Sequence, residues 1–145
     1  MSGMLVADDL AAESAPVLGT AIATADRLGV PVTVLHVLSR ERVEGLQQGD
    51  GSARTYLDDV LAQVRGQLRI RVEEQVGSAR AASIRLEVRQ GEPDETVVAE
   101  LRDGGYEFGA LGVRSRSRVG KLVFGSTAQS ILLLAPCPVL TVPIA

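Results

Sequence analysis

LGVRSRSRVGKLVFGSTAQSILLLAPCP, residues 111–138, is the stretch of sequence that decides the fold. It leaves an apolar run through Gly112, crosses a loop with three arginines and one lysine, and enters an apolar segment at Gly125 that stops at Pro136. This order predicts a strand, a basic loop flanked by glycines, and a helix. Because the first turn of a helix has unpaired N–H groups and a partial positive charge, the loop and the helix start form a candidate anion site. Phosphate is the anion that we expect there.

A simpler interpretation of the same residues stays open. Gly125 and Ser126 could serve only as a helix cap. The cations of the loop, Arg114 among them, could belong to a solvated surface segment, since charge runs on surfaces usually bind nothing specific.

The composition limits the classes of function. A chain of 145 residues suits one domain, 1–145, and the apolar content of 46% is enough for a core. The aromatic content of 3% predicts an aliphatic core and argues against a surface that stacks nucleic-acid bases. With a net charge of −3, the molecule has no general attraction for nucleic acids or anionic membranes. We find no apolar run of membrane-spanning length and no signal peptide, so a cytoplasmic location is expected.

Cysteine and histidine each occur once. Cys137 therefore cannot form an intrachain disulfide or a thiolate metal cluster, and its place between two prolines in an apolar run predicts a buried structural thiol. His36 has no second histidine with which to form a histidine-based metal site, and we interpret it as the end of a strand.

Strands and helices are predicted to alternate along the chain. The predicted strands are 4–7, 30–38, 83–89, 108–112 and 137–142, the predicted helices are 14–28, 55–77, 93–104 and 126–134, and 39–52 is expected to be a flexible connection. This alternation predicts a three-layer α/β/α architecture with a parallel sheet. Ligands of such sheets bind beyond the C-terminal strand ends. Asp8 and Asp9 would share a crevice with the anion site if the first and fourth strands are neighbours.

Three common nucleotide or hydrolase motifs are missing from the sequence. A P-loop would need glycine where Ser115 stands and a hydroxyl where Leu122 stands. Neither a G-x-G-x-x-G dinucleotide fingerprint nor a G-x-S-x-G elbow is present. Ser126 has no histidine placed to activate it, so nucleophilic hydrolysis is not expected.

The spacing of glycines resembles the signature of the universal stress protein family, G-x-x-G-x9-G-[ST]. Gly112 and Ser115 are followed after nine residues by Gly125 and Ser126. The resemblance covers the whole chain, because the first strand with Asp9, the turn Gly91-x-Pro93 and the segment 135–140 also look like their counterparts in the family. It implies a five-stranded parallel sheet of order 3-2-1-4-5, of the adenine-nucleotide α-hydrolase-like type. It further implies a homodimer paired through the C-terminal strand.

The resemblance also implies a site for ATP, with Mg²⁺ as the accompanying ion. Ala7, Asp9 and Val37 would hold the adenine and ribose. The phosphates would lie against the loop residues Leu111, Gly112, Arg114, Ser115, Gly125, Ser126 and Thr127.

Two positions depart from the family pattern. Ser115 replaces a glycine whose freedom would let the backbone approach phosphate, and Leu10-Ala11 replaces the usual Gly-Ser after the first aspartate. We therefore carry three hypotheses. The chain is an ATP-binding regulatory module of the stress response with at most slow ATP hydrolysis, or the same fold without a nucleotide, acting through dimerisation and protein partners. The third is an enzyme that hydrolyses or ligates adenine nucleotides, which the missing catalytic motifs disfavour.

Overall fold

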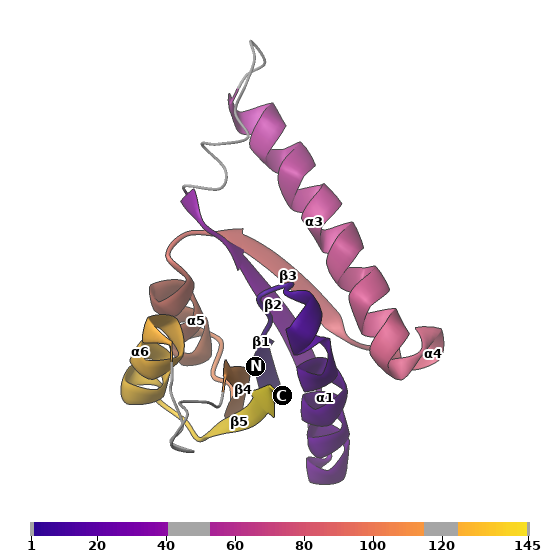
Figure 1. Ribbon diagram of the computed structural model, residues 1–145, viewed down its shortest axis with the longest axis vertical. Helices are drawn as coiled ribbons and strands as arrows, with labels where there is room; N and C mark the ends of the chain where they lie inside the picture. Colours follow the sequence, from indigo (N-terminus) through magenta and orange to yellow (C-terminus); the bar gives the residue numbers. More distant parts are fainter. Residues whose placement is uncertain (1, 41–52, 115–124, 145) are drawn as a thin grey trace.

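The computed structural model describes residues 2–40, 53–114 and 125–144, and five parallel strands form its central sheet (Figure 1). The strands are β1 (Met4–Ala7), β2 (Val32–Leu38), β3 (Arg85–Gln90), β4 (Phe108–Arg114) and β5 (Val139–Ile144). They lie in the order β3-β2-β1-β4-β5, and every neighbouring pair is parallel. The predicted architecture and strand order are confirmed.

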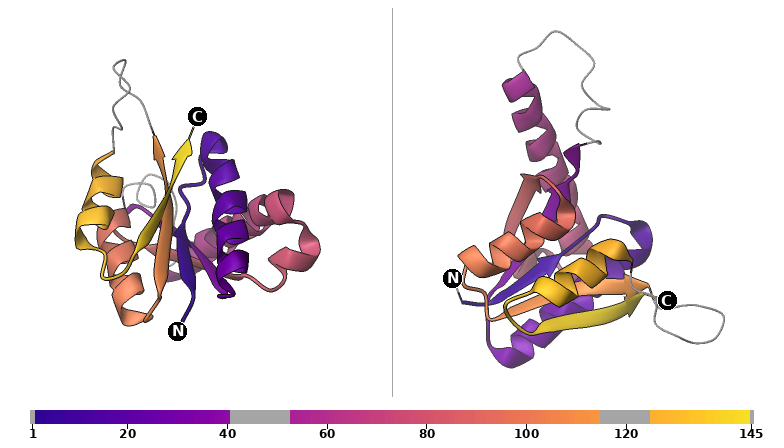
Figure 2. Two further views of the ribbon diagram at one scale, coloured as in Figure 1. Left: turned by 90° about the horizontal axis from the view of Figure 1, so that it is seen from below. Right: turned by 90° about the vertical axis from the view of Figure 1, so that its left-hand side faces the viewer.

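Helices cover both faces of the sheet, which gives the three layers seen in Figure 2. One face carries α1 (Ala15–Leu28) and α3 (Ala53–Val76), and the other carries α5 (Pro93–Asp103) and α6 (Ser126–Leu134). The sequence pattern did not predict the short segments η1 (Ala12–Ser14) and α4 (Ser78–Ala81). Among the described helices, none is both long enough and apolar enough to cross a membrane.

The core consists of two aliphatic layers, one on each side of the sheet. Met4 and Val6 of β1 pack toward α1 and α3, whereas Leu5 between them packs toward α5 and α6. This alternation follows from strand geometry, in which successive side chains point to opposite faces. Every residue of β2 is buried, which fits a strand of β-branched and aliphatic residues in which only Thr33 and His36 are polar.

The two edge strands differ slightly from the prediction. β5 begins and ends two residues later than predicted, so Pro143 lies inside it. The missing N–H of this proline is tolerated because β5 lies at the edge of the sheet, with β4 on one side. β3 forms the opposite edge and covers Arg85–Gln90, where 83–89 was predicted.

The main helices occupy their predicted positions. In α1, Ala21, Ile22 and Ala25 are buried, and the helix ends at Gly29 with a φ of 71°, a left-handed conformation that glycine adopts readily. The expected flexible connection falls largely on residues 41–52 and most of the basic loop on residues 115–124, and both ranges lie outside the described residues.

Candidate functional site

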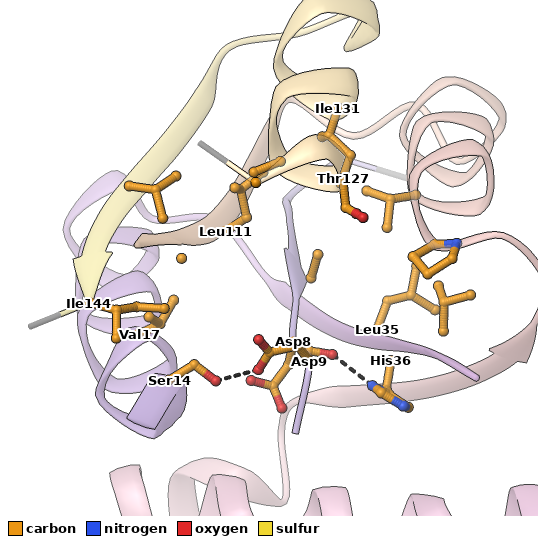
Figure 3. Close-up of a pocket in the computed structure, with 18 of the residues that line it drawn as sticks. Asp8, Asp9, Ser14, Val17, Leu35, His36, Leu111, Thr127, Ile131 and Ile144 are labelled. Carbon is orange, nitrogen blue, oxygen red and sulfur yellow. Dashed lines mark hydrogen bonds between the residues drawn. The ribbon is translucent and has the colours of Figure 1, made fainter. Parts of the chain in front are cut away.

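A pocket opens where the C-terminal ends of β1, β2 and β4 meet (Figure 3). It has a volume of about 410 Å³, which falls in the range of small-molecule sites, roughly 300–1,000 Å³. The strand order explains its position: β1 and β4 are neighbours, so the chain segments that follow them diverge from one edge of the sheet.

The walls of the pocket are mainly aliphatic. Leu35, Val97, Leu111 and Ile131 come from strands and helices on the α5 and α6 side of the sheet. Polar groups lie on two sides: Figure 3 shows the carboxylates of Asp8 and Asp9 across the pocket from Thr127. An apolar chamber with polar groups at its rim suits a flat, partly polar ligand.

Most of the residues that we predicted for a nucleotide site come together in this pocket. Eight of them line it: Ala7, Asp9, Val37, Leu111, Gly112, Arg114, Gly125 and Thr127. Ser126 is exposed at the first turn of α6 and is not among the lining residues. Ser115 lies outside the described residues. Ser14, Pro93 and Ile144 also contribute to the walls, and the sequence did not predict them as site residues.

Asp9 is held by the loop that follows β1. Its Oδ1 atom accepts hydrogen bonds from the N–H of Ala11, at 2.9 Å, and from the hydroxyl of Ser14. Partial burial alone would raise the pKa of Asp9, but these two bonds and the charges of Arg71 and Arg114 outweigh it, so the pKa lies below its usual value. Asp9 is therefore ionised at neutral pH.

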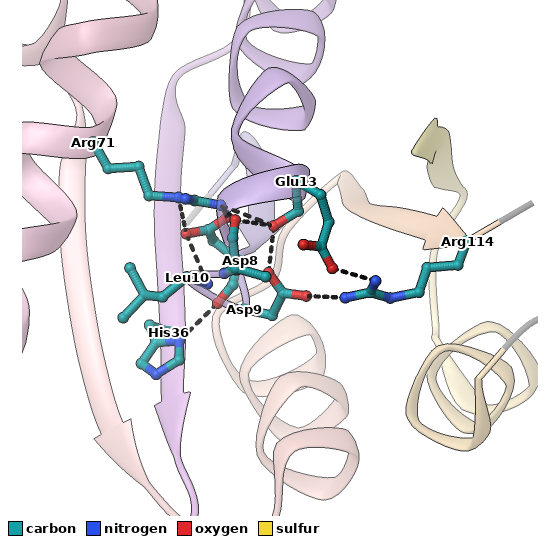
Figure 4. A network of polar contacts seen from close by, with 9 residues as sticks. Asp8, Asp9, Leu10, Glu13, His36, Arg71 and Arg114 are labelled. Atoms are coloured by element: carbon teal, nitrogen blue, oxygen red, sulfur yellow. Dashed lines mark hydrogen bonds and ion pairs between the residues drawn. The ribbon is translucent and has the colours of Figure 1, made fainter. Parts of the chain in front are cut away.

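Arg114 crosses the mouth of the pocket from the end of β4 (Figure 4). Its Nη2 atom lies 3.9 Å from Oδ2 of Asp9, and its Nη1 atom forms an ion pair with Glu13. All three side chains are about half-exposed. A guanidinium in this place can pair with an anionic ligand, provided that the anion competes with Glu13 and Asp9.

Asp8 has a different environment, which the sequence did not reveal. Its carboxylate is only 1% exposed and faces Arg71 of α3, with 2.8 Å between Arg71 Nε and Asp8 Oδ2. Burial raises the pKa of Asp8, and the hydrogen bonds and charge of Arg71 oppose this rise. The sequence held one weak signal, because Arg71 borders the apolar stripe of Leu68 and Val72 in α3.

Two single residues differ from their predicted settings. His36 lies within β2 rather than at its end, is buried, and donates from Nδ1 to the carbonyl oxygen of Asp8 at 2.8 Å. Because a carbonyl oxygen can only accept, Nδ1 carries the proton of this bond. Cys137 is half-buried rather than fully buried, and burial raises the pKa of its thiol. Within the described part of the chain, no group of three or more histidine, cysteine or acidic side chains could hold a metal ion.

The comparisons with known proteins decide the family. A sequence model of the universal stress protein family matches residues 1–143. The chain belongs to this family. A comparison with curated proteins gave no match.

Solved structures of universal stress proteins have the same fold as this chain. A universal stress protein from Archaeoglobus fulgidus is 26% identical with a TM-score of 0.60, and 97% of this chain and 98% of that chain are covered. The universal stress protein UspA from Lactobacillus plantarum is 19% identical with a TM-score of 0.71 and 97% coverage of each chain. A structure of the universal stress protein from Archaeoglobus fulgidus in complex with dAMP is 21% identical, with a TM-score of 0.55 and 97% coverage of each chain.

Two positions of the universal stress protein pattern have a physical explanation here. A β-carbon on Gly112 would lie 2.8 Å from Cγ2 of Val17, so the glycine lets α1 approach β4 closely. Leu10 takes the place of a family glycine, and its φ of 61° is the left-handed conformation that such a glycine would adopt without strain.

Proposed function

We propose that this universal stress protein is a small cytoplasmic module of the stress response that binds ATP, with Mg²⁺, in the pocket at the ends of β1, β2 and β4. The observation that carries the proposal is the pocket itself, which combines an aliphatic chamber with an ionised Asp9 on one side and the N-terminus of α6 on another. The complex of a related protein with dAMP supports an adenine nucleotide as the ligand class.

The proposed arrangement assigns one part of the ligand to each wall. Adenine would lie in the aliphatic chamber beside Ala7 and Val37, with the ribose near Asp9, whose Oδ2 atom can accept from a hydroxyl. The phosphates would lie toward Arg114 and the first turn of α6, where Gly125, Ser126 and Thr127 offer N–H groups and hydroxyls. Leu111, Gly112 and Ser115 would border the phosphate loop. The unpaired N–H groups of a helix start favour such an anion.

We expect at most slow ATP hydrolysis. The described lining residues that could act as a general base are Asp8, Asp9 and His36, and each is held by a protein partner through one of its atoms, while Nε2 of the buried His36 has no hydrogen-bond partner among the described residues. Asp8 pairs with Arg71, Asp9 accepts from Ser14, and His36 donates to the Asp8 carbonyl. A turnover within the ordinary enzyme range of about 1–1,000 per second would contradict this expectation.

Calorimetric titration with ATP, with and without Mg²⁺, tests the proposal. Thr127 lines the pocket, so Thr127→Tyr should fill it and remove the binding heat, whereas Gln129→Tyr, an exposed position one half-turn further along α6, should bind like the wild type. The protein must first be checked for nucleotide that co-purified. No heat from nucleotide-free wild-type protein would refute the ATP-binding proposal.

A second candidate function rests on a different surface. β5 is an edge strand, and the last turn of α6 before it exposes Leu133 and Leu134 by 76% and 63%. Unpaired strand edges and exposed apolar side chains are features of association surfaces. We propose that this edge pairs two copies of the chain, which would let the protein act through dimerisation and protein partners even without nucleotide.

Analytical ultracentrifugation tests the dimer. A charge on an edge strand disfavours pairing, so Thr141→Asp in β5 should shift the protein toward the monomer. Thr20→Asp on the exposed side of α1 adds the same charge away from the edge and should not. A wild-type protein that sediments as a monomer at all concentrations would refute pairing through β5.

A further inference from the structure

Arg71 of α3 contacts three residues beneath the candidate site, although it does not itself line the pocket. Its side chain is only 11% exposed. The Nε atom faces Asp8, and the Nη2 atom donates to Asp8 Oδ1 at 3.1 Å, to the carbonyl of Ala11 at 2.7 Å and to Ser14 Oγ at 2.8 Å (Figure 4). One guanidinium thus joins α3 to three points of the segment between β1 and α1.

The contact with Ser14 determines where the serine hydroxyl sends its proton. A hydroxyl has one donor and two acceptor positions, and Arg71 occupies an acceptor position of Ser14 Oγ. Two acceptors are within reach of the proton, the Asp9 Oδ1 atom and the Ala11 carbonyl at 2.9 Å. The carbonyl already accepts from Arg71 and from the N–H of Ser14, whereas Asp9 carries a full negative charge. The proton therefore goes to Asp9.

We propose that Arg71 is a positioning residue for the ligand site: through Ser14, it fixes the carboxylate of Asp9 so that Oδ1 is held by the protein and Oδ2 is left for the ligand. This inference deepens the proposed function and rests on it only for the identity of the ligand. Ser14 stands at the N-cap of α1 but makes no capping bond, which fits a hydroxyl that is used for Asp9 instead.

The planar guanidinium is essential to this role. An arginine presents several N–H donors in a fixed fork, whereas the lysine ammonium is a single point on a flexible stem. Arg71→Lys keeps the charge opposite Asp8, but it has one nitrogen in place of the two with which Arg71 faces Asp8 through Nε and Ala11 and Ser14 through Nη2. It should therefore leave the fold intact, but the Asp9 carboxylate should no longer be held in one orientation.

Two measurements test the positioning role. In the ligand-free protein, carboxyl NMR titration of Asp9 should give a higher pKa in Arg71→Lys than in the wild type, and Ser14→Ala should reproduce this rise. Arg69→Lys changes an exposed arginine two positions away on α3 and should leave the titration unchanged. In ATP titrations, Arg71→Lys should weaken binding by about three- to tenfold, which corresponds to the loss of about one hydrogen bond.

A double-mutant cycle separates positioning from a general structural effect. If Arg71 acts through Asp9, Arg71→Lys should weaken ATP binding in the wild type but not further in Asp9→Ala. Equal losses in both backgrounds, or an unchanged Asp9 titration in both Arg71→Lys and Ser14→Ala, would overturn the inference. Wild-type protein that fails to bind ATP would refute the proposed function instead, and the ligand-free titration would then decide the positioning role alone.

Discussion

Gly112 of β4 lies so close to Ile144 of β5 that a β-carbon on the glycine would come within 2.9 Å of the Ile144 Cδ1 atom, and within 2.8 Å of Val17 Cγ2. Real β-carbons do not tolerate such contacts, so in Gly112→Ala the side chains of Val17 and Ile144, or the elements that carry them, must shift. Overpacking of this kind usually costs about 1–3 kcal/mol. We expect chemical denaturation to show that loss.

The same substitution elsewhere in the chain should have the opposite effect. Gly66 lies in the middle of α3, and a β-carbon added to it would meet nothing within 4 Å, so Gly66→Ala should stabilise the protein by about 1 kcal/mol through helix propensity. If both variants moved the free energy of unfolding in the same direction, the close packing of Gly112 would not be the cause.

Leu10 gives a second prediction, because its backbone and its side chain make opposite demands. Its φ of 61° is unfavourable for leucine. Its side chain packs against the core around Leu68 and against a smaller cluster formed by Leu38, Val60 and Val64. Leu10→Ala removes the packing and keeps the strained backbone. Leu10→Gly removes the packing and relieves the strain, which is worth about 1 kcal/mol or more.

At an ordinary site a change to glycine destabilises a protein more than a change to alanine. At Leu10 we expect the reverse order. We expect Leu10→Gly to be less destabilised than Leu10→Ala by about 1 kcal/mol in urea unfolding, although glycine is the smaller residue and loosens the unfolded chain. Alanine proving the more stable of the two would show that the left-handed conformation of Leu10 carries little strain.

The part of the site that the sequence predicted is the part that strand topology determines. Asp9 follows β1 and Gly112 lies near the C-terminal end of β4, and the C-terminal ends of adjacent parallel strands meet at one edge of the sheet. Alternating apolar segments predicted the layers, but the order β3-β2-β1-β4-β5 came from the family resemblance. Periodicity does not distinguish one order of parallel strands from another.

The residues that the sequence did not reveal depend on packing between distant elements. Arg71 reaches Asp8 from 63 positions along the chain, and only the placement of α3 on the sheet brings them together. Ser14 stands at the N-cap of α1, where serine is common, but its hydroxyl serves Asp9. A local pattern indicates which residues can make a bond, whereas the tertiary structure selects the bond that forms.

The lowered pKa of Asp9 predicts that the wild type and Asp9→Asn lose different amounts of stability in acid. Its pKa is lowered in the folded state, so its contribution to stability is present above the ordinary carboxyl pKa and is lost as the pH falls through the lowered folded value. Between about pH 6 and about pH 3, the wild type should therefore lose more stability than Asp9→Asn, by less than about 1 kcal/mol because Asp9 is about half-exposed.

Asp8 changes the stability in the opposite direction as the pH falls, so its contribution has to be considered in the comparison of the wild type with Asp9→Asn. Its pKa is raised by burial, so the folded state takes up a proton more readily than the unfolded chain as the pH falls. Asp8 is present in both proteins, so the effect of its burial cancels in the difference. The part of its raised pKa that the charge of Asp9 causes does not cancel, and it makes the difference smaller. Urea unfolding of both proteins at each pH gives the free energies, and a larger acid loss in Asp9→Asn than in the wild type would contradict the direction given for Asp9.

The ion pair between Glu13 and Arg114 leads to a prediction about the strength of ATP binding. Because Glu13 pairs with Arg114 at the mouth of the pocket, an incoming phosphate must compete with it for the guanidinium. Glu13→Gln removes the competing charge and should tighten ATP binding. Both side chains are about half-exposed, and such pairs are worth up to about 1 kcal/mol, so the gain should reach at most about fivefold.

Salt dependence distinguishes this competition from a change in pocket shape. The gain from Glu13→Gln should shrink as the ionic strength rises, since screening weakens both the Glu13 pair and the phosphate contact. Glu74→Gln, which removes the same charge from the exposed side of α3, serves as the control for net charge. Calorimetric titration of the three proteins at low and high salt measures the effect. ATP binding that is equally tight in Glu13→Gln and in the wild type at low salt would show that Glu13 does not restrain Arg114.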